Sequence, residues 1–382
     1  MNIISVVGAR PNFMKIAPFI KAIEAYNQTA VKQIVHTLVH TGQHYDDRMS
    51  KAFFEALGIP DAHINLGIGS GSHAEQVGYT MIAFEKVLLD RKPDWVVVVG
   101  DVNATLACSV TAKKLQIKVC HIEAGLRSGD MSMPEEVNRL VTDRLSDLLL
   151  TPDVLSSANL KLEGSADNRV VFVGNIMIDT LEANRNKAQD ISIESIVENN
   201  LQADVLPDLT QDLPLAVVTL HRPSNVDDPK ILSALVEFFV NDVCPRMRLI
   251  WTVHPRTAKQ LQTFGLWQQL MQTPNLVVLH PLGYHDMLKL NMSAKIMFTD
   301  SGGLQEECSV LGTPCLTLRW NTERPITLRE HGGASVLVGN NVEKIRAAFY
   351  ETIALPRTPD SPPLWDGHTA QRALAAILNY QI

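Results

Sequence analysis

The chain has 382 residues, too many for a single hydrophobic core of ordinary size, so we expect two domains. Its 46% hydrophobic and 20% charged residues are typical of a folded globular protein and exclude a chain that is disordered throughout. The net charge of −7 argues against nucleic acid or another polyanion as a general partner.

The first half of the chain alternates apolar, β-branched runs with segments of helical spacing. We expect strands at 2–7, 33–39, 95–101, 118–122 and 148–150, and helices at 13–26, 47–57, 73–89, 104–115 and from Pro134 onward. Strands that are apolar on both faces and alternate with helices indicate a parallel sheet covered on both sides. The fold class is therefore α/β, and the first half is predicted to be Rossmann-like.

The pattern breaks near Gly174, where we place a hinge, and the polar segment 184–208 offers little that could build a core. A second series of strands is expected at 215–220, 249–253, 276–279, 295–298, 315–318 and 335–338. A Pro-rich connector, 355–363, leads to a last helix at 370–378 that we expect to pack back on the first domain. The predicted domains are 1–173 together with 364–382, and 174–363.

The cysteines and the N-terminus bear on cellular location. The cysteines show no Cys-x-x-Cys spacing and lie mostly in apolar runs, which favours reduced core residues of a cytoplasmic protein over disulfides or metal ligands. They are Cys108, Cys120, Cys244, Cys308 and Cys315. The chain begins directly with a strand, and no apolar run approaches the roughly 18 residues of a membrane span, so we expect neither secretion nor a membrane segment.

The stretch 299–307 follows an apolar run and precedes residues at helical spacing, so it is predicted to be a strand-to-helix turn. Ser301 is a favourable N-cap, and Gly302 and Gly303 let the backbone approach a ligand at the positive end of the helix. We interpret this turn as the binding site of a diphosphate, with Glu307 placed to accept hydrogen bonds from the hydroxyls of a ribose. An ordinary turn between strand and helix would be equally consistent with Ser-Gly-Gly alone.

Acidic residues gather at expected strand ends and loops of the first domain. Asp101 is either a helix N-cap, the commoner role for such an Asp, or a catalytic acid or base. Glu123 ends an apolar strand, where partial burial would shift its pKa toward the range useful for proton transfer. Glu135 and Glu136 follow Pro134 and could simply stabilise the start of a helix. Two cations flank the start of the first helix: Arg10 and Lys15.

Cationic side chains gather at strand ends of the second domain. His221 and Arg222 follow one strand, and we interpret them as part of a phosphate clamp, although a buried structural histidine is the usual alternative. Similar groups follow two further strands: His254, Arg256, Arg319, Glu323 and Arg324. The histidines lack the short spacing of metal ligands, so no metal site is expected.

These motifs, taken in order, resemble the UDP-N-acetylglucosamine 2-epimerases over residues 3 to about 340. The stretches that carry the resemblance are Gly8-Ala9-Arg10-Pro11 with Lys15, Gly100-Asp101, 121–127, 133–139, His221-Arg222, 300–307 and 322–325. The resemblance implies a GT-B fold, in which two Rossmann-like domains with parallel sheets face a central cleft. It also implies reversible interconversion of UDP-N-acetylglucosamine and UDP-N-acetylmannosamine, for polysaccharide biosynthesis, without NAD or any other cofactor and without a required metal.

Transferred residue by residue, the resemblance implies catalytic roles for Asp101, Glu123, Glu135 and His221, with Lys15 and Arg139 at further active-site positions. It implies substrate contacts through UDP for Arg10, Ser301, Gly302, Gly303, Glu307 and Arg324. The acids would remove and return a proton at C2 of the sugar while UDP leaves C1 and re-adds, with 2-acetamidoglucal as the intermediate.

The sequence departs from the bacterial pattern of the family at Asn12, at 45–47 and after Arg222, which puts allosteric binding of UDP-N-acetylglucosamine in doubt. A hydrolysing enzyme of the same family, or one acting on a differently substituted UDP-HexNAc, is an alternative. Other classes are a GT-B glycosyltransferase and a nucleotide-sugar-binding regulator, but neither needs three acids around C2. We expect a cytoplasmic homodimer whose partner is a UDP-sugar substrate, with no nucleic acid and no membrane.

Overall fold

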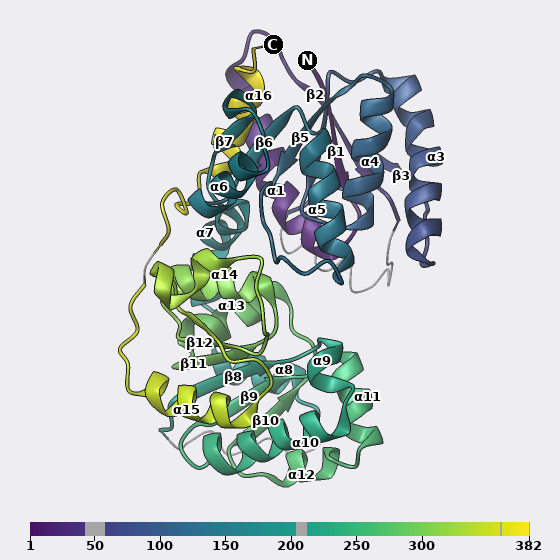
Figure 1. Cartoon of the computed structure of the whole chain (residues 1–382). Helices are drawn as coiled ribbons and strands as arrows, with labels where there is room; N and C mark the ends of the chain where they lie inside the picture. Colours follow the sequence, from purple (N-terminus) through teal and green to yellow (C-terminus); the bar gives the residue numbers. More distant parts are fainter. Residues whose placement is uncertain (43–57, 204–211, 360, 382) are drawn as a thin grey trace. The chain divides into compact units, whose positions relative to one another are not determined.

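The computed structural model describes residues 1–42, 58–203, 212–359 and 361–381, except for the Arg10 side chain. The chain divides into two compact units, one of Met1–Ala183 with Pro363–Ile382 and one of Asn184–Pro362 (Figure 1). The division falls within α7 (Ile176–Gln189), after the hinge that was expected near Gly174. The helix predicted at 47–57 and the family positions 45–47 lie outside the described residues.

The first unit contains a seven-stranded parallel sheet with the order β3-β2-β1-β4-β5-β6-β7. Its strands are β1 (Asn2–Val7), β2 (Val35–His40), β3 (Ile64–Asn65), β4 (Trp95–Val99), β5 (Lys118–Ile122), β6 (Leu148–Thr151) and β7 (Val170–Phe172). Every residue of β4 is buried, as expected for a central parallel strand with helices on both faces. The parallel α/β class predicted from the alternating pattern is confirmed.

The helices of the first unit are α1 (Arg10–Thr29), α3 (His73–Arg91), α4 (Asn103–Lys114), α5 (Pro134–Leu145), α6 (Val154–Leu162), α7 and α16 (Thr369–Leu378), with a short 3-10 turn at Asp167–Arg169. α3 begins with a capping box, in which the Ser72 side chain accepts from the backbone N–H of Glu75 and the Glu75 carboxylate accepts from that of Ser72. Pro134 occupies the first turn of α5, as predicted.

The C-terminal segment is fixed to the first unit by specific contacts. α16 packs against α1, and the Asp179 carboxylate accepts from the backbone N–H groups of Thr369 and Ala370 at 3.0 and 2.7 Å. A Cβ on Gly174 would lie 2.1 Å from the Leu364 carbonyl oxygen. Gly174 therefore allows a close approach of two backbone segments, in a conformation (φ 94°) that favours glycine.

The second unit contains a six-stranded parallel sheet with the order β10-β9-β8-β11-β12-β13. Its strands are β8 (Leu215–Thr219), β9 (Arg248–Thr252), β10 (Leu276–Leu279), β11 (Ile296–Thr299), β12 (Cys315–Thr317) and β13 (Ser335–Leu337). One face of this sheet carries an aromatic cluster, in which the Phe239 ring packs edge-on against Trp251 and Phe298 at 5.3 Å between ring centroids. All six strands predicted for this half are present.

The helices of the second unit are α8 (Ile193–Asn200), α9 (Pro223–Val226), α10 (Pro229–Phe238), α11 (Pro255–Thr263), α12 (Trp267–Gln272), α13 (Tyr284–Ser293), α14 (Gly302–Leu311) and α15 (Val342–Ile353). A π-helical turn, Phe239–Val243, follows α10, and 3-10 turns lie at Pro325–Thr327 and Arg329–His331.

The expectation that 184–208 contributes little to a core was wrong for its described part. Ile196 and Val197 of α8 are buried and pack with residues of β8 and β10, including Leu215 and Leu279. This short amphipathic helix covers the sheet with few apolar residues, which is why its composition looks polar.

The five cysteines are buried free thiols, as predicted. Among the described residues, no helix is both long enough and apolar enough to cross a membrane.

Candidate functional site

In the first unit the carboxyl ends of β1, β4 and β5 are adjacent, because these three strands are neighbours in the sheet. They bring together residues far apart in the sequence: the Lys15 ammonium forms a buried ion pair with the Glu123 carboxylate. Glu123 has a φ of 71°, which is rare for a residue with a side chain and marks a locally constrained backbone. The structure thus places two of the predicted site residues in direct contact.

Asn12 organises the same strand ends. Its Oδ1 accepts from the backbone N–H groups of Gly8 and Ala9 at 3.2 and 3.0 Å, and its Nδ2 donates to the Val99 carbonyl at 3.0 Å. A carboxylate could accept the first two hydrogen bonds but could not donate the third. Asn12 therefore ties the turn after β1 to the end of β4, which gives a physical role to this departure from the family pattern.

Asp101 is not a helix cap. α4 begins at Asn103 with Val102 in the N-cap position, and the Asp101 carboxylate instead pairs with Arg139, at 2.5 Å between Oδ2 and Nη1. The side chain of Asp101 is 26% exposed, whereas that of Arg139 is 2% exposed. The acid can therefore be reached from solvent while a buried guanidinium holds it in place, and the Asn138 side chain fixes its carbonyl at 2.8 Å.

Glu135 and Glu136 have different environments. Glu135 is exposed at the start of α5. Glu136 is buried, accepts from the backbone N–H groups of Ser128 and Gly129, and pairs with Arg139 at 2.6 Å. Burial alone would raise the pKa of Glu136, but these backbone hydrogen bonds and the guanidinium hold it below its usual value. Sequence reasoning missed Glu136 as the residue that orients Arg139.

In the second unit the Asp300 carboxylate, at the end of β11, orients the turn that follows β8. Its Oδ1 lies 2.9 Å from His221 Nδ1. Its Oδ2 accepts hydrogen bonds from the backbone N–H groups of His221 and Arg222 and from the Asn225 side chain. Burial would raise the pKa of Asp300, but the hydrogen bond and charge of His221 and its other donors lower it. Asp300 belongs to the motif 300–307 that contributes to the family resemblance, but it was not predicted as a site residue.

The turn before α14 has the predicted form, with Ser301 at the N-cap position and Gly302 and Gly303 in the first turn. The Ser301 side chain makes no capping hydrogen bond. A Cβ on Gly302 would lie 2.7 Å from Arg324 Nη1, whereas a Cβ on Gly303 would meet no atom of the described residues within 4 Å. Gly302 therefore makes room for Arg324, and Gly303 leaves the helix start open.

Arg324 belongs to a buried cluster of alternating charge. Its guanidinium pairs with Glu306, at 2.7 Å from Nε to Oε1, and also with Glu323. Glu323 in turn pairs with Arg319 at 2.6 Å. Burial would raise the pKa of Glu323, but the two arginines hold it far below its usual value. This cluster fixes the Arg324 side chain beside the start of α14.

Glu307 is buried one turn into α14, and burial raises its pKa to about 7, partly offset by hydrogen bonds with Tyr284 and Asn291. A carboxyl group with this pKa exchanges its proton near neutrality, and it is well suited to accept hydrogen bonds from a ligand that enters its surroundings.

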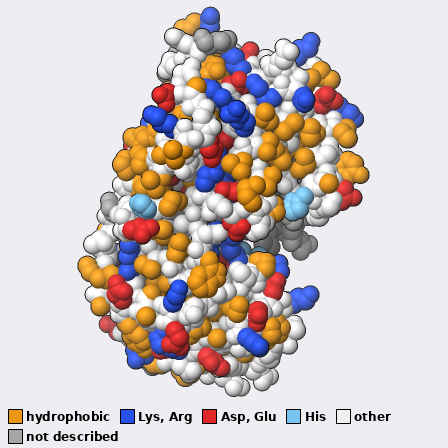
Figure 2. Space-filling view, in the orientation of Figure 1, with side chains coloured by type: hydrophobic (Ala, Val, Ile, Leu, Met, Phe, Trp, Pro, Cys, Tyr) orange, Lys and Arg blue, Asp and Glu red, His pale blue; other side chains and the backbone are white. Residues whose placement is uncertain are grey.

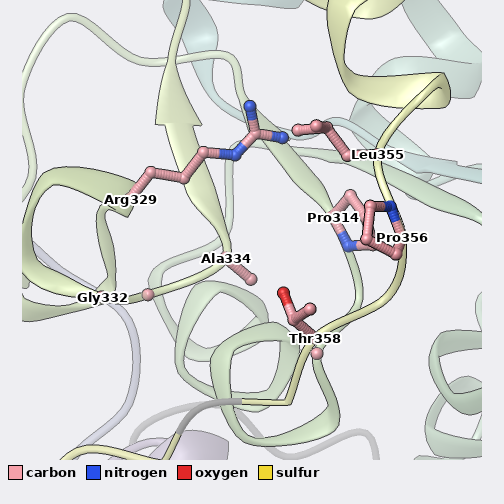
Figure 3. A pocket seen from close by; sticks show the side chains of 9 residues that line it. Pro314, Arg329, Gly332, Ala334, Leu355, Pro356 and Thr358 are labelled. Atoms are coloured by element: carbon pink, nitrogen blue, oxygen red, sulfur yellow. The ribbon is translucent and has the colours of Figure 1, made fainter.

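A pocket of about 280 Å³ lies elsewhere in the second unit (Figure 3). Figure 3 shows the Arg329 guanidinium at one side and the connector residues Leu355 and Pro356 at the other. Pro314 and Ala334 of its wall directly precede β12 and β13, so the pocket lies at the amino edge of the sheet. The predicted site residues lie at the opposite, carboxyl edge, where open α/β sheets bind ligands.

Within the described ranges, no group of three or more His, Cys, Asp or Glu side chains is arranged to hold a metal ion. The polar groups at the carboxyl edges are of the types that can accept a proton, pair with a cation or receive an anionic ligand at the start of a helix.

Two parallel α/β sheets with polar residues at their carboxyl edges define the class of two-domain nucleotide-binding proteins with the GT-B fold. A family model described as UDP-N-acetylglucosamine 2-epimerase matches residues 27–378, so the chain belongs to the UDP-N-acetylglucosamine 2-epimerase family. The family resemblance inferred from the motifs is thereby confirmed, and the enzyme class is that of an isomerase rather than a glycosyltransferase.

A relative from Methanocaldococcus jannaschii named UDP-N-acetylglucosamine 2-epimerase is 40% identical, with 100% of this chain and 99% of the relative covered. A relative from Pseudomonas aeruginosa named UDP-2,3-diacetamido-2,3-dideoxy-D-glucuronate 2-epimerase is 36% identical, with 99% of each chain covered. The crystal structure of the M. jannaschii enzyme in complex with UDP-GlcNAc and UDP matches with a TM-score of 0.85 and 38% identity, covering 100% of both chains.

Proposed function

We propose that this protein interconverts UDP-N-acetylglucosamine and UDP-N-acetylmannosamine without hydrolysis. A base removes the C2 proton, the C1–O bond to UDP breaks, and 2-acetamidoglucal forms. UDP then adds back to C1 while a proton is delivered to the opposite face of C2. The reaction consumes no electrons, so it needs no redox cofactor.

The observation that supports this proposal is the set of acidic and cationic side chains near the strand ends of the first unit. Asp101, Glu123 and Glu135 are the proposed proton-transfer groups, and Arg139 and Lys15 hold the first two through ion pairs. These two ion pairs fix the positions of Glu123 and Asp101 at the strand ends, as proton transfer to a defined carbon atom requires.

The second unit supplies the proposed nucleotide site. His221, oriented by Asp300, is proposed to stabilise the departing diphosphate. The start of α14 and the residues around it are proposed to bind UDP: Ser301, Gly302, Gly303, Glu307 and Arg324, together with Arg10, whose side chain lies outside the described residues. The open space at Gly303 supports this assignment, since a phosphate can approach the backbone there.

A time course of proton NMR spectra with UDP-N-acetylglucosamine tests this function. We expect a new UDP-N-acetylmannosamine signal that reaches equilibrium with the starting sugar. Accumulation of UDP and free N-acetylmannosamine would instead identify a hydrolysing enzyme.

A second candidate is a 2-epimerase for a differently substituted UDP-HexNAc. It is favoured by the 36% identity with the P. aeruginosa relative, whose name specifies a diacetamido glucuronate. The same NMR experiment with that sugar distinguishes the two, because the true substrate is converted at the higher kcat/KM.

We also propose that the protein is a cytoplasmic homodimer. Hydrophobic side chains gather over α3, α4 and α5 on the face shown in Figure 2. Tyr79, Ile82 and Leu89 of α3 are each more than half exposed, which is unusual for such residues on one helix. Light scattering should give the mass of a dimer for the wild type and of a monomer for Ile82→Glu; a monomeric wild type would contradict the proposal.

A further inference from the structure

His121 lies within β5, and its ring is fully buried. Its Nδ1 is 2.6 Å from Oδ1 of Asp143, and its Nε2 is 2.8 Å from the carbonyl oxygen of Gly100. A carbonyl oxygen has no proton to donate, so the Nε2 atom must carry the hydrogen of that contact.

The second ring nitrogen faces an ionised acceptor. Besides His121, the Asp143 carboxylate accepts from the Arg127 guanidinium at 2.7 Å and from the Gly125 N–H at 3.0 Å. Burial would raise the pKa of Asp143, but the charges and hydrogen bonds of His121 and Arg127 hold it below its usual value. Both ring nitrogens of His121 thus lie at hydrogen-bond distance from an acceptor, the Asp143 carboxylate at Nδ1 and the Gly100 carbonyl at Nε2, and only a doubly protonated ring donates to both.

The hydrogen bond to Gly100 links the His121 ring to the proposed chemistry. Gly100 immediately precedes Asp101, and its own N–H donates to the Ile122 carbonyl at 3.2 Å, just before Glu123. The ends of β4 and β5 are thus joined by two hydrogen bonds, one of them from His121. Glu123 has a positive φ, which is unfavourable for a residue with a side chain, so the end of β5 needs restraint from its surroundings to keep its direction.

We propose that His121 is a positioning residue, a buried imidazolium that holds the Gly100 carbonyl and so sets the placement of Asp101 and Glu123. This role rests on the proposed epimerase function, since it assigns His121 to the placement of the acids of that reaction. A neutral ring would leave one of its two buried acceptors without a donor, which is unfavourable.

The charge state is tested first, on the full chain without substrate. In a sample with ¹⁵N-labelled histidine at about pH 8, above the ordinary histidine pKa of about 6.5, both ring nitrogens of His121 should carry a directly bonded proton. The signals are assigned by through-bond correlation to the backbone. One unprotonated ring nitrogen would overturn the proposal, whether or not the protein is an epimerase.

The positioning role is tested with a matched pair of variants. The amide nitrogen of Gln lies close to the Nε2 position of histidine and can still donate to Gly100, whereas that of Asn lies close to the Nδ1 position and cannot. His121→Asn should lower kcat by roughly 100-fold, the scale for a misplacement of about 1 Å at a reacting centre. His121→Gln should retain most of the wild-type kcat, and both should bind UDP with unchanged affinity.

Thermal unfolding of both variants separates positioning from folding. Equal losses of kcat in the two variants, or losses that follow their melting temperatures, would overturn the positioning role. If neither variant folds, the NMR result on the wild type alone decides whether His121 is a buried cation. A neutral His121 ring would then overturn the proposal. A wild type that folds, carries the cation and shows no turnover would instead contradict the epimerase function.

Discussion

The Asp300 carboxylate lies 2.9 Å from Nδ1 of His221, and Asp300 is fully buried while the His221 side chain is 39% exposed. The buried carboxylate therefore fixes the orientation of an imidazole that solvent can reach. His254 packs beside the same ring, at 5.8 Å between centroids, and burial together with the charge of His221 lowers the pKa of His254. Asp300 and His254 thus hold the His221 ring in one orientation at the end of β8.

Replacing this carboxylate should impair catalysis more than folding. Asp300→Asn keeps the shape of the side chain but weakens the contact that orients His221, so kcat should fall by roughly 100-fold or more, the scale for losing one group that stabilises developing negative charge. Asp227→Asn is the matched control, because Asp227 pairs with Arg256 on the surface of the same unit and such pairs contribute little. Unchanged turnover in Asp300→Asn would contradict the role of His221.

The two neighbouring glutamates of α5 should respond differently to the same substitution. Glu135→Gln should leave the free energy of unfolding unchanged, since Glu135 is exposed, but should lower kcat by roughly 100-fold or more. Glu136→Gln should lower the free energy of unfolding by about 1–3 kcal/mol through the loss of charged hydrogen bonds to Arg139 and the loop.

The loss of unfolding free energy in Glu136→Gln should depend on pH. The folded pKa of Glu136 lies below its unfolded value of about 4.5, so its contribution is fully present above that pH and is lost as the pH falls through the folded pKa. Urea denaturation of both variants at several pH values measures this. A stability loss in Glu135→Gln as large as that in Glu136→Gln would show that the two environments are misassigned.

The paired glycines of α14 provide another contrast. Gly302→Ala should destabilise the protein and weaken UDP binding, because the new Cβ displaces Arg324 and Glu323. Gly303→Ala should not lower stability, since open space surrounds that position and alanine favours a helix. Calorimetric titration with UDP should nevertheless show weaker binding for Gly303→Ala, as the methyl group keeps the diphosphate from the backbone. Wild-type UDP affinity in that variant would exclude this helix start as the diphosphate site.

Glu307 should make stability depend on pH near neutrality. Because its folded pKa of about 7 lies above the unfolded value of 4.5, its ionisation costs nothing below pH 4.5, and stability is lost as the pH rises through about 7. Above that pH, Glu307→Gln should be more stable than the wild type by on the order of 3 kcal/mol, at 1.36 kcal/mol per unit of pKa. Chemical denaturation between pH 5 and about 8 checks the sign.

The same residue also tests the nucleotide site. Glu307→Ala should weaken the binding of free UDP by about 1–3 kcal/mol, the scale for leaving polar partners unpaired. An unchanged dissociation constant in calorimetric titration would mean that the ribose is bound elsewhere.

Local patterns in the sequence were sufficient to predict the described strands except β3 and β7, which are only two and three residues long. The run from Trp95 to Val99 predicts a buried parallel strand on its own, and each predicted strand of the second unit is present within a residue or two. The two buried apolar residues of α8, Ile196 and Val197, were missed, because a short helix with one narrow apolar side resembles a polar loop in composition.

The partners of the site residues could not be predicted in the same way. Whether Glu135 or Glu136 is buried depends on the rotation of α5 about its axis, which its tertiary packing sets. The N-cap alternative for Asp101 was wrong, because the helix starts two residues later and the buried Arg139 attracts the carboxylate. Asp300 reaches His221 only because β8 and β11 are neighbours in the sheet, a long-range pairing that no local motif records.

Proton exchange at C2 of the sugar distinguishes the proposed mechanism from other routes to inversion, and NMR of the reaction in D2O measures it. We expect UDP-N-acetylmannosamine formed from UDP-N-acetylglucosamine to carry deuterium at C2, and the remaining starting sugar to acquire deuterium there by the reverse reaction. Inversion at C2 with full retention of the original hydrogen would contradict a mechanism in which the acids of the first unit remove and replace that proton.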